Sequence, residues 1–247
     1  MANWNEQERT RQSFGSVPRA GGDVAGVTFD EGLRSYMLSI YNYMGSAVLL
    51  TGIVAIVAAF SGFTASVLGT PLQWVIALAP LAFILAISFG LNKMSLGTLQ
   101  VVFWSFAVAM GLSVSWIFLV YTGPSIAVTF FATAAAFAGL SLFGYTTKKN
   151  LSGMGSFLIM GVIGLIVASI INIFLQSGPL AFVISGLGVL IFAGLTAYDT
   201  QRLKNDYQYL RGTAFMDKAV ILGATSLYLD FVNMFMFLLQ FLGARED

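Results

Sequence analysis

The distribution of charged residues constrains this chain more than any other feature of its sequence. No Asp, Glu, Lys or Arg occurs in residues 35–92, 94–147 or 150–198. Each interval is long enough for two membrane-spanning helices, because one helix needs about 20 apolar residues to cross the hydrocarbon core. Charged residues make up only 9% of the chain, against about 25% in soluble domains. The chain therefore lacks the surface of a soluble protein and is predicted to be an integral membrane protein.

Seven apolar segments separated by helix-breaking residues predict an all-α membrane protein with seven transmembrane helices. The breaks contain Gly, Pro and Ser, as in Ser61-Gly62, Gly123-Pro124 and Ser177-Gly178-Pro179. The apolar runs are continuous, which favours helices over a β-barrel, whose strands alternate apolar and polar residues. The predicted spans are residues 36–60, 72–90, 99–121, 124–143, 154–175, 180–198 and 219–242.

The basic residues predict how the chain is oriented in the membrane. Of the 12 Lys and Arg, all but Arg245 lie in the N-terminal tail or in loops on its side of the membrane. Basic residues concentrate on the cytoplasmic side, so the N-terminus is expected in the cytoplasm and the C-terminus on the periplasmic or extracellular side. Residues 1–27 mix charge with Gly, Ser and Pro, and predict a disordered cytoplasmic tail. Residues 28–247 then form a single seven-helix transmembrane domain.

Composition also excludes several classes of function. The chain contains no Cys and no His, which excludes disulfides, thiol chemistry and the usual zinc and haem ligands. We therefore expect no cofactor, and a net charge of +1 predicts no nucleic-acid partner. Asp and Glu remain as ligands for a hard cation such as Ca²⁺.

Asp230 is the only charged residue inside a predicted span and the first candidate site residue. A charge at this depth costs about 2.5 to 3.5 kcal/mol on insertion scales, so it should face the bundle interior or water. Ser226, Asn233 and Gln240 lie on the same helical face, which makes that face polar from end to end. These features favour a functional site. The structural alternative is a protonated Asp230 that only bonds a neighbouring helix.

Asp199 lies just beyond the sixth predicted span, where charged residues resume. Taken alone, it is as consistent with an interfacial charge that pairs with Arg202 or Lys204 as with a site. Span lengths place it about 10 to 18 Å from Asp230 along the membrane normal. An apolar pattern at helical spacing allows the sixth helix to continue past Asp199. If the two carboxylates do approach, they are expected to share one proton and to titrate as a unit.

Five segments of the chain carry a family resemblance. They are GLRSYMLSIYNYMG, IFLVYTGPSIAVTFF, LFGYTTKKNLSGMGSFL, LTAYDTQRLKNDY and LYLDFVNMFMFLLQFLG. Together they resemble a bacterial member of the Bax inhibitor-1 family, also called the transmembrane Bax-inhibitor-motif family, over residues 32–243. The resemblance implies a bundle in the bacterial inner (plasma) membrane, with the last helix central and wrapped by the other six.

The resemblance also implies a calcium leak pathway that two aspartates gate in response to pH. The family's Tyr-Asp and Tyr-x-Asp motifs fall on Tyr198-Asp199 and on Tyr228 to Asp230. Asp199 and Asp230 thus become the candidate pH-sensing residues and possible Ca²⁺ ligands. Family members carry a basic latch near the cytoplasmic end of helix two, but the aligned position here is Gly90, so Lys93 is the candidate latch. The remaining candidate pathway residues are Tyr198, Ser226, Tyr228 and Asn233.

Two other functions stay open at this point. The first is a non-conducting regulator that binds a membrane protease or another membrane protein through the charged tail and residues 199–218. The second is an intramembrane aspartyl protease, whose second aspartate follows a Gly-x-Gly pattern. Asp230 follows Tyr228-Leu229 instead, so we expect no enzyme. The expected partners are the lipid bilayer, Ca²⁺ and, in the alternative, a second membrane protein.

Overall fold

The computed structural model describes residues 20–246, with side chains from residue 31 onward. Within this part of the chain, regular secondary structure is α-helical apart from an isolated bridge between Tyr121 and Arg245. The helices are α1 (Ala20–Phe60), α2 (Phe63–Val67), α3 (Pro71–Gly90), α4 (Leu96–Val114), α5 (Ile117–Val120), α6 (Gly123–Thr146), α7 (Ser152–Leu175), α8 (Gly178–Leu210) and α9 (Met216–Leu242). Residues 1–19 of the predicted tail lie outside the described residues. α1 begins at Ala20, within the stretch of residues 1–27 that was predicted as a tail.

Seven helical segments among the described residues are long and apolar enough to cross a membrane, which confirms the predicted seven-helix class. The predicted breaks do separate them. After α1 the chain turns at Gly62, whose φ of 78° lies in the left-handed region that glycine adopts readily. Ser95 caps α4 by accepting a hydrogen bond from the backbone N–H of Thr98. Proline stands in the first turn of α3, α6 and α8, where its missing N–H costs nothing.

The sixth span is longer than its apolar run. α8 has 33 residues and continues past Asp199 to Leu210. Leu203 and Tyr207 on this extension are buried against the rest of the bundle. The extension follows the apolar stripe noted in the sequence, and it keeps Asp199 inside a helix rather than in a loop.

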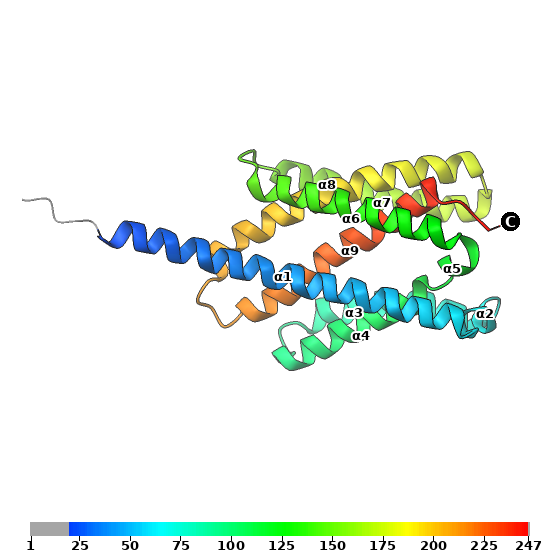
Figure 1. Ribbon diagram of the computed structural model, residues 1–247, viewed down its shortest axis with the longest axis horizontal. Helices are drawn as coiled ribbons and strands as arrows, with labels where there is room; N and C mark the ends of the chain where they lie inside the picture. The colour runs from blue at the N-terminus through cyan, green and yellow to red at the C-terminus, as the bar shows by residue number, and fades with distance from the viewer. Residues whose placement is uncertain (1–19, 247) are drawn as a thin grey trace, which may run out of the picture.

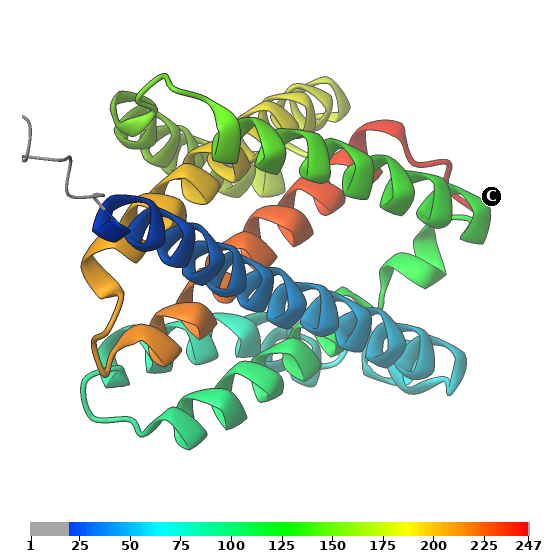
Figure 2. The ribbon, with the colours of Figure 1, turned by 60° about the vertical axis from the view of Figure 1, so that its left-hand side comes forward.

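The last helix is central, as predicted. In the apolar 18-residue segment of α9, 67% of the residues are buried inside the protein. In the corresponding segments of the other six spans this share is at most 39%. α8, α1, α6 and α4 pack directly on α9, while α3 and α7 cover α4 and α8 from outside. Figure 2 shows α9, in orange to red, enclosed behind α1 and α6. Among the largest fully buried side chains are five from this helix: Ile221, Leu227, Tyr228, Met234 and Leu239.

The two ends of the described chain lie at opposite ends of the bundle (Figure 1). The end of the bundle where α1 begins contains most of the basic residues of the described chain, in its loops and in the adjoining helix turns, and we call it the basic end. Its cations are Arg34, Lys93, Lys148, Lys149, Arg202, Lys204, Arg211 and Lys218. That this end faces the cytoplasm stays a prediction from charge.

Candidate functional site

Asp230 is buried in the middle of α9, with only 5% of its surface exposed. Its Oδ2 atom has no hydrogen-bond partner among the described residues. Burying a polar atom without a partner is costly, and an isolated charge costs more still. An oxygen in this state is therefore a position at which a proton, a cation or a rearranged side chain would be stabilised.

Asp199 is equally buried but is held by two neighbours. The Ser226 hydroxyl of α9 donates a hydrogen bond to Asp199 Oδ2. Nη2 of Arg202 lies 3.3 Å from the same oxygen and donates to Ser226 Oγ over 3.1 Å. These three side chains, which we call the α8–α9 clasp, join the two helices directly. Of the two cations that the sequence offered as partners of Asp199, the structure selects Arg202.

Asp230 lies within electrostatic reach of Asp199, and Arg202 lies within reach of both carboxylates. The described contacts include no hydrogen bond between them. Ser226, which touches Asp199, lies one turn before Asp230, or about 6 Å along the helix axis. The separation along the bundle is therefore smaller than the span lengths implied, because α8 continues past Asp199 to Leu210.

The two motif tyrosines are placed differently from the aspartates that follow them. Tyr228 is fully buried, and its hydroxyl lies 2.6 Å from Thr51 Oγ1, which donates to the carbonyl oxygen of Ala107 over 2.9 Å. Its ring meets Phe106 edge to face at 5.3 Å. Tyr228 thus ties α9 to α1 and α4. The sequence gives no signal for Thr51, since one Thr in an apolar span is common.

Tyr198 packs between α7 and Arg202. A Cβ placed on Gly155 of α7 would lie only 2.4 Å from the Tyr198 ring, so glycine is needed for this contact. The Arg202 guanidinium lies 5.8 Å from the centre of the same ring, within the range of a cation–π interaction. Tyr198 therefore supports the cation of the α8–α9 clasp.

The remaining candidate residues contribute less to the aspartate site. Asn233 is half-buried, and its Nδ2 donates to the backbone carbonyl of Leu229 over 2.8 Å. Lys93 is exposed in the loop between α3 and α4. The contacts of the described residues include none between Lys93 and either aspartate, so the cation beside them in this structure is Arg202. A latch formed by Lys93 stays a prediction.

A chain of hydroxyl groups reaches the site from the side and was missed in the sequence. Tyr41 Oη lies 2.5 Å from Ser141 Oγ, which lies 3.0 Å from Thr200 Oγ1. Thr200 directly follows Asp199, so the chain joins α1 and α6 to the residue next to the site. Ser and Thr are frequent between packed membrane helices, and spacing alone does not show which of them meet.

The described residues contain no cluster of three or more Asp, Glu, His or Cys side chains that could hold a metal ion. Ca²⁺ prefers six to eight oxygen ligands. Asp199 and Asp230 would supply part of such a shell, and hydroxyl, carbonyl or water oxygens the rest.

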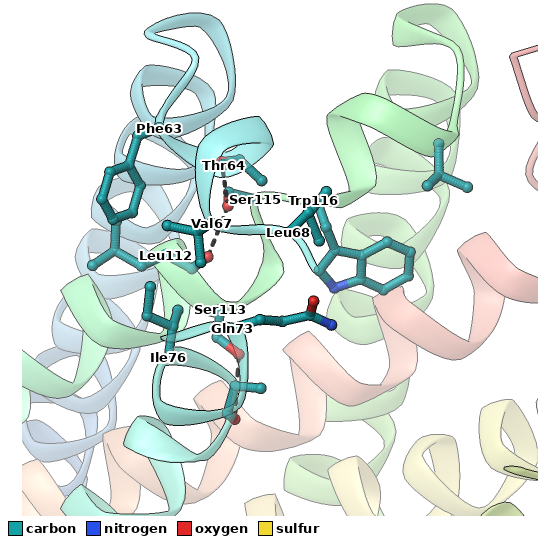
Figure 3. A pocket seen from close by; sticks show the side chains of 12 residues that line it. Phe63, Thr64, Val67, Leu68, Gln73, Ile76, Leu112, Ser113, Ser115 and Trp116 are labelled. Carbon is teal, nitrogen blue, oxygen red and sulfur yellow. Dashed lines mark hydrogen bonds between the residues drawn. The ribbon is translucent and has the colours of Figure 1, made fainter. Parts of the chain in front are cut away.

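A pocket of about 360 Å³ lies at the end of the bundle opposite the basic end (Figure 3). α2, α3 and α4 contribute most of its wall. Thr64 donates to Ser115 Oγ over 2.8 Å, and Ser115 donates to the carbonyl of Leu112 over 2.7 Å. No charged side chain lines this pocket, and its hydroxyl groups satisfy one another, so we assign no site to it.

Comparison with known proteins is consistent with these findings. A family model described as "Inhibitor of apoptosis-promoting Bax1" matches residues 33–247. An uncharacterized protein of Rickettsia prowazekii is 45% identical over 221 residues, which cover 89% of this chain and 94% of that protein. The inner membrane protein YbhL of Escherichia coli is 44% identical over 219 residues, which cover 87% and 94%. An uncharacterized membrane protein of Streptococcus pyogenes is 31% identical over 220 residues, which cover 88% and 96%. The resemblance carried by the five segments is thereby confirmed, and the chain belongs to the Bax inhibitor-1 family of multi-pass membrane proteins.

Proposed function

We propose that this protein is a passive, pH-sensitive leak for cations, Ca²⁺ foremost, in the bacterial inner membrane, with Asp199 and Asp230 as its gate. The observation that supports the proposal is the buried Oδ2 of Asp230, which lacks a hydrogen-bond partner among the described residues and lies within electrostatic reach of a second carboxylate. Ionisable residues inside membrane bundles typically belong to ion or proton pathways. The inner-membrane location follows that of the relative YbhL, an inner membrane protein of Escherichia coli.

The α8–α9 clasp gives this gate a physical mechanism. A cation that binds between the carboxylates has to displace Arg202, because two positive charges repel each other at such distances. The Arg202 side chain is 42% exposed, so its guanidinium can move into water while the rest of the side chain stays on the bundle. Protonating either aspartate removes the negative charge that attracts both cations. Protons, Arg202 and Ca²⁺ therefore compete for the same two side chains.

The direct test is Ca²⁺ uptake into vesicles that contain the purified full-length protein and a Ca²⁺ indicator, measured over a range of pH. D199N and D230N each replace one titratable carboxylate by an amide, and both are expected to flatten the pH dependence of the flux. D217N is the matched control, because Asp217 is exposed in the first turn of α9 and outside the clasp. A pH profile that both site variants leave unchanged would end the gating proposal.

The same experiment separates the leak from the alternative function. A flux that equals that of empty vesicles at every pH would reject conduction and favour the non-conducting regulator. In that case the search turns to a membrane protein that co-purifies with the wild-type chain and is lost when residues 1–27 are deleted. A leak is expected to keep its flux after the same deletion.

A further inference from the structure

α1 and α6 are neighbours that leave an open groove between them. α1 packs mainly on α4 and α9, and α6 packs on α8 and α9. A cavity of about 550 Å³ lies between the basic-end half of α1 and the C-terminal half of α6. Its apolar walls include Met37 and Leu38 of α1 and Phe137 and Leu142 of α6. We call this cavity the α1–α6 groove; Figure 2 shows the two helices, blue and green, running apart in front of α9.

An apolar surface lies between the same two helices in the half of the bundle away from the basic end. A second cavity of about 360 Å³ lies between the following turns of α1 and the first half of α6. Phe231 and Phe235 of the central helix contribute to its lining. In a membrane this seam faces hydrocarbon, so the molecule that fills it has at least one long apolar chain. The rest of that molecule has to match the polar groups nearer the basic end.

Polar groups lie along the groove in a definite order. Arg34 is exposed and lines the groove at the basic end. Seven residues further along α1, or about 10 Å deeper, the hydroxyls of Tyr41 and Ser141 lie on its wall. Beyond them the lining is apolar. A cation, then hydroxyl groups, then an apolar channel match the phosphate, the ester groups and the acyl chain of a phospholipid.

A second cation makes the rim of the groove more positive. Nζ of Lys204 donates to the backbone carbonyl of Tyr145 over 2.7 Å and lies 4.8 Å from the centre of its ring. Tyr145 itself lines the groove. An ammonium group has three donors, so two remain for a further acceptor. Two cations beside one groove favour a headgroup with net negative charge over a zwitterionic one, and basic pockets between membrane helices bind such lipids.

We propose that the α1–α6 groove binds one anionic phospholipid, with its phosphate beside Arg34, on the side of the groove where Lys204 contacts Tyr145, and one acyl chain along α6. Tyr41 lines the groove at the depth of its ester groups. This inference does not depend on the proposed leak, because it concerns binding alone. The occupied groove would place a lipid against the hydroxyl chain that leads to Thr200.

The test uses phosphatidylglycerol with a photoactivatable diazirine in one acyl chain. The full-length protein is placed in phosphatidylcholine nanodiscs that contain a few per cent of this probe. After illumination, mass spectrometry locates the adducts, which are expected on residues 37–41 and 137–142. Unlabelled phosphatidylglycerol should compete for these adducts, and equal amounts of phosphatidylcholine or inorganic phosphate should not.

Two variants examine the polar and the apolar part of the groove separately. R34Q is expected to lower labelling of the groove about fivefold, the factor for one basic residue beside an anionic headgroup. K148Q is the matched control, because Lys148 is an exposed cation in the α6–α7 loop that does not line the groove. A138F places a ring into the groove, since Ala138 is exposed on its α6 wall, and should abolish labelling there with Arg34 intact.

Three results would overturn the proposal. The first is equal labelling of the groove by a phosphatidylcholine probe, or an equal effect of R34Q and K148Q, which leaves only ordinary lipid contact. The second is competition by inorganic phosphate, which indicates a free-anion site. The third is a disulfide-linked dimer of A138C. The natural chain has no Cys, so such a dimer would mean that a second copy fills the groove.

Discussion

Replacing Thr51 by Val should destabilise the protein more than replacing its partner Tyr228 by Phe. The two side chains form one buried hydrogen bond of 2.6 Å, and Thr51 passes its own proton to the carbonyl of Ala107. The proton in the Thr51–Tyr228 bond therefore belongs to Tyr228. T51V leaves this hydroxyl, which is fully buried, with nothing to donate to. Y228F removes the donor and leaves Thr51 bonded to Ala107.

The magnitudes follow from this asymmetry. Y228F loses one hydrogen bond between membrane helices, which costs about 0.6 kcal/mol on average. T51V leaves an unpaired buried polar group, which costs about 1 to 3 kcal/mol. In the double variant neither group is unpaired, so its loss of stability should be smaller than the sum of the two and close to that of T51V or below it.

The assay is unfolding of the purified protein by SDS in mixed micelles, followed by circular dichroism. The free energies of unfolding of the wild type, both single variants and the double variant complete a double-mutant cycle. Additive losses, or a Y228F variant less stable than T51V, would refute the assigned direction of the hydrogen bond. Since neither residue contacts a carboxylate in this structure, both variants should keep the wild-type pH profile of Ca²⁺ flux.

Three further predictions concern other contacts. R202Q should raise Ca²⁺ flux at neutral pH by up to about fivefold, the factor for losing an ion pair of about 1 kcal/mol, because the competing cation is gone; a lower flux in the vesicle assay would contradict the mechanism. G188V should cost about 1 to 3 kcal/mol in SDS unfolding, because a Cβ at Gly188 would lie 2.4 Å from the Phe237 ring; unchanged stability would show that the ring moves freely. Q201A should speed tryptic cleavage after Lys149, because Gln201 anchors this loop: it accepts a hydrogen bond from the N–H of Leu151 and donates one to the Lys149 carbonyl, each over 2.8 Å. The rate of cleavage is followed by gel electrophoresis of the digest, and an unchanged rate would contradict the anchoring role.

The sequence predicted the helices well because the membrane imposes a simple rule. Every backbone polar group in hydrocarbon needs an internal partner, so uncharged apolar runs of sufficient length become helices, and all seven appear in the structure. The C-terminal end of the sixth helix was harder to predict. Its last turns carry charges such as Arg202 and Lys204, and only the spacing of Leu203 and Tyr207 indicated that the helix continues.

The residues of the aspartate site could be predicted from the sequence, but their arrangement in space could not. One buried charge in a span singles out Asp230, whereas its proximity to Asp199 came from the family resemblance. Whether Arg202 or Lys204 pairs with Asp199 depends on the rotation of α8 about its axis. Arg202 lies three residues after Asp199 and faces α9, while Lys204 points to α6 and bonds the Tyr145 carbonyl. Which neighbour each helix face meets is set by helix packing, and this packing could not be predicted from the single sequence.

The length of α8 has a consequence for membrane thickness. At 1.5 Å per residue its 33 residues extend about 50 Å, some 20 Å more than the hydrocarbon core. The excess carries Arg202, Lys204 and Asp206, which resist transfer into lipid. This charged collar sets the depth of Asp199 relative to the headgroups. In a thicker or thinner bilayer the bundle should therefore tilt or deform the lipid around its other end, and the aspartates should keep their distance from water.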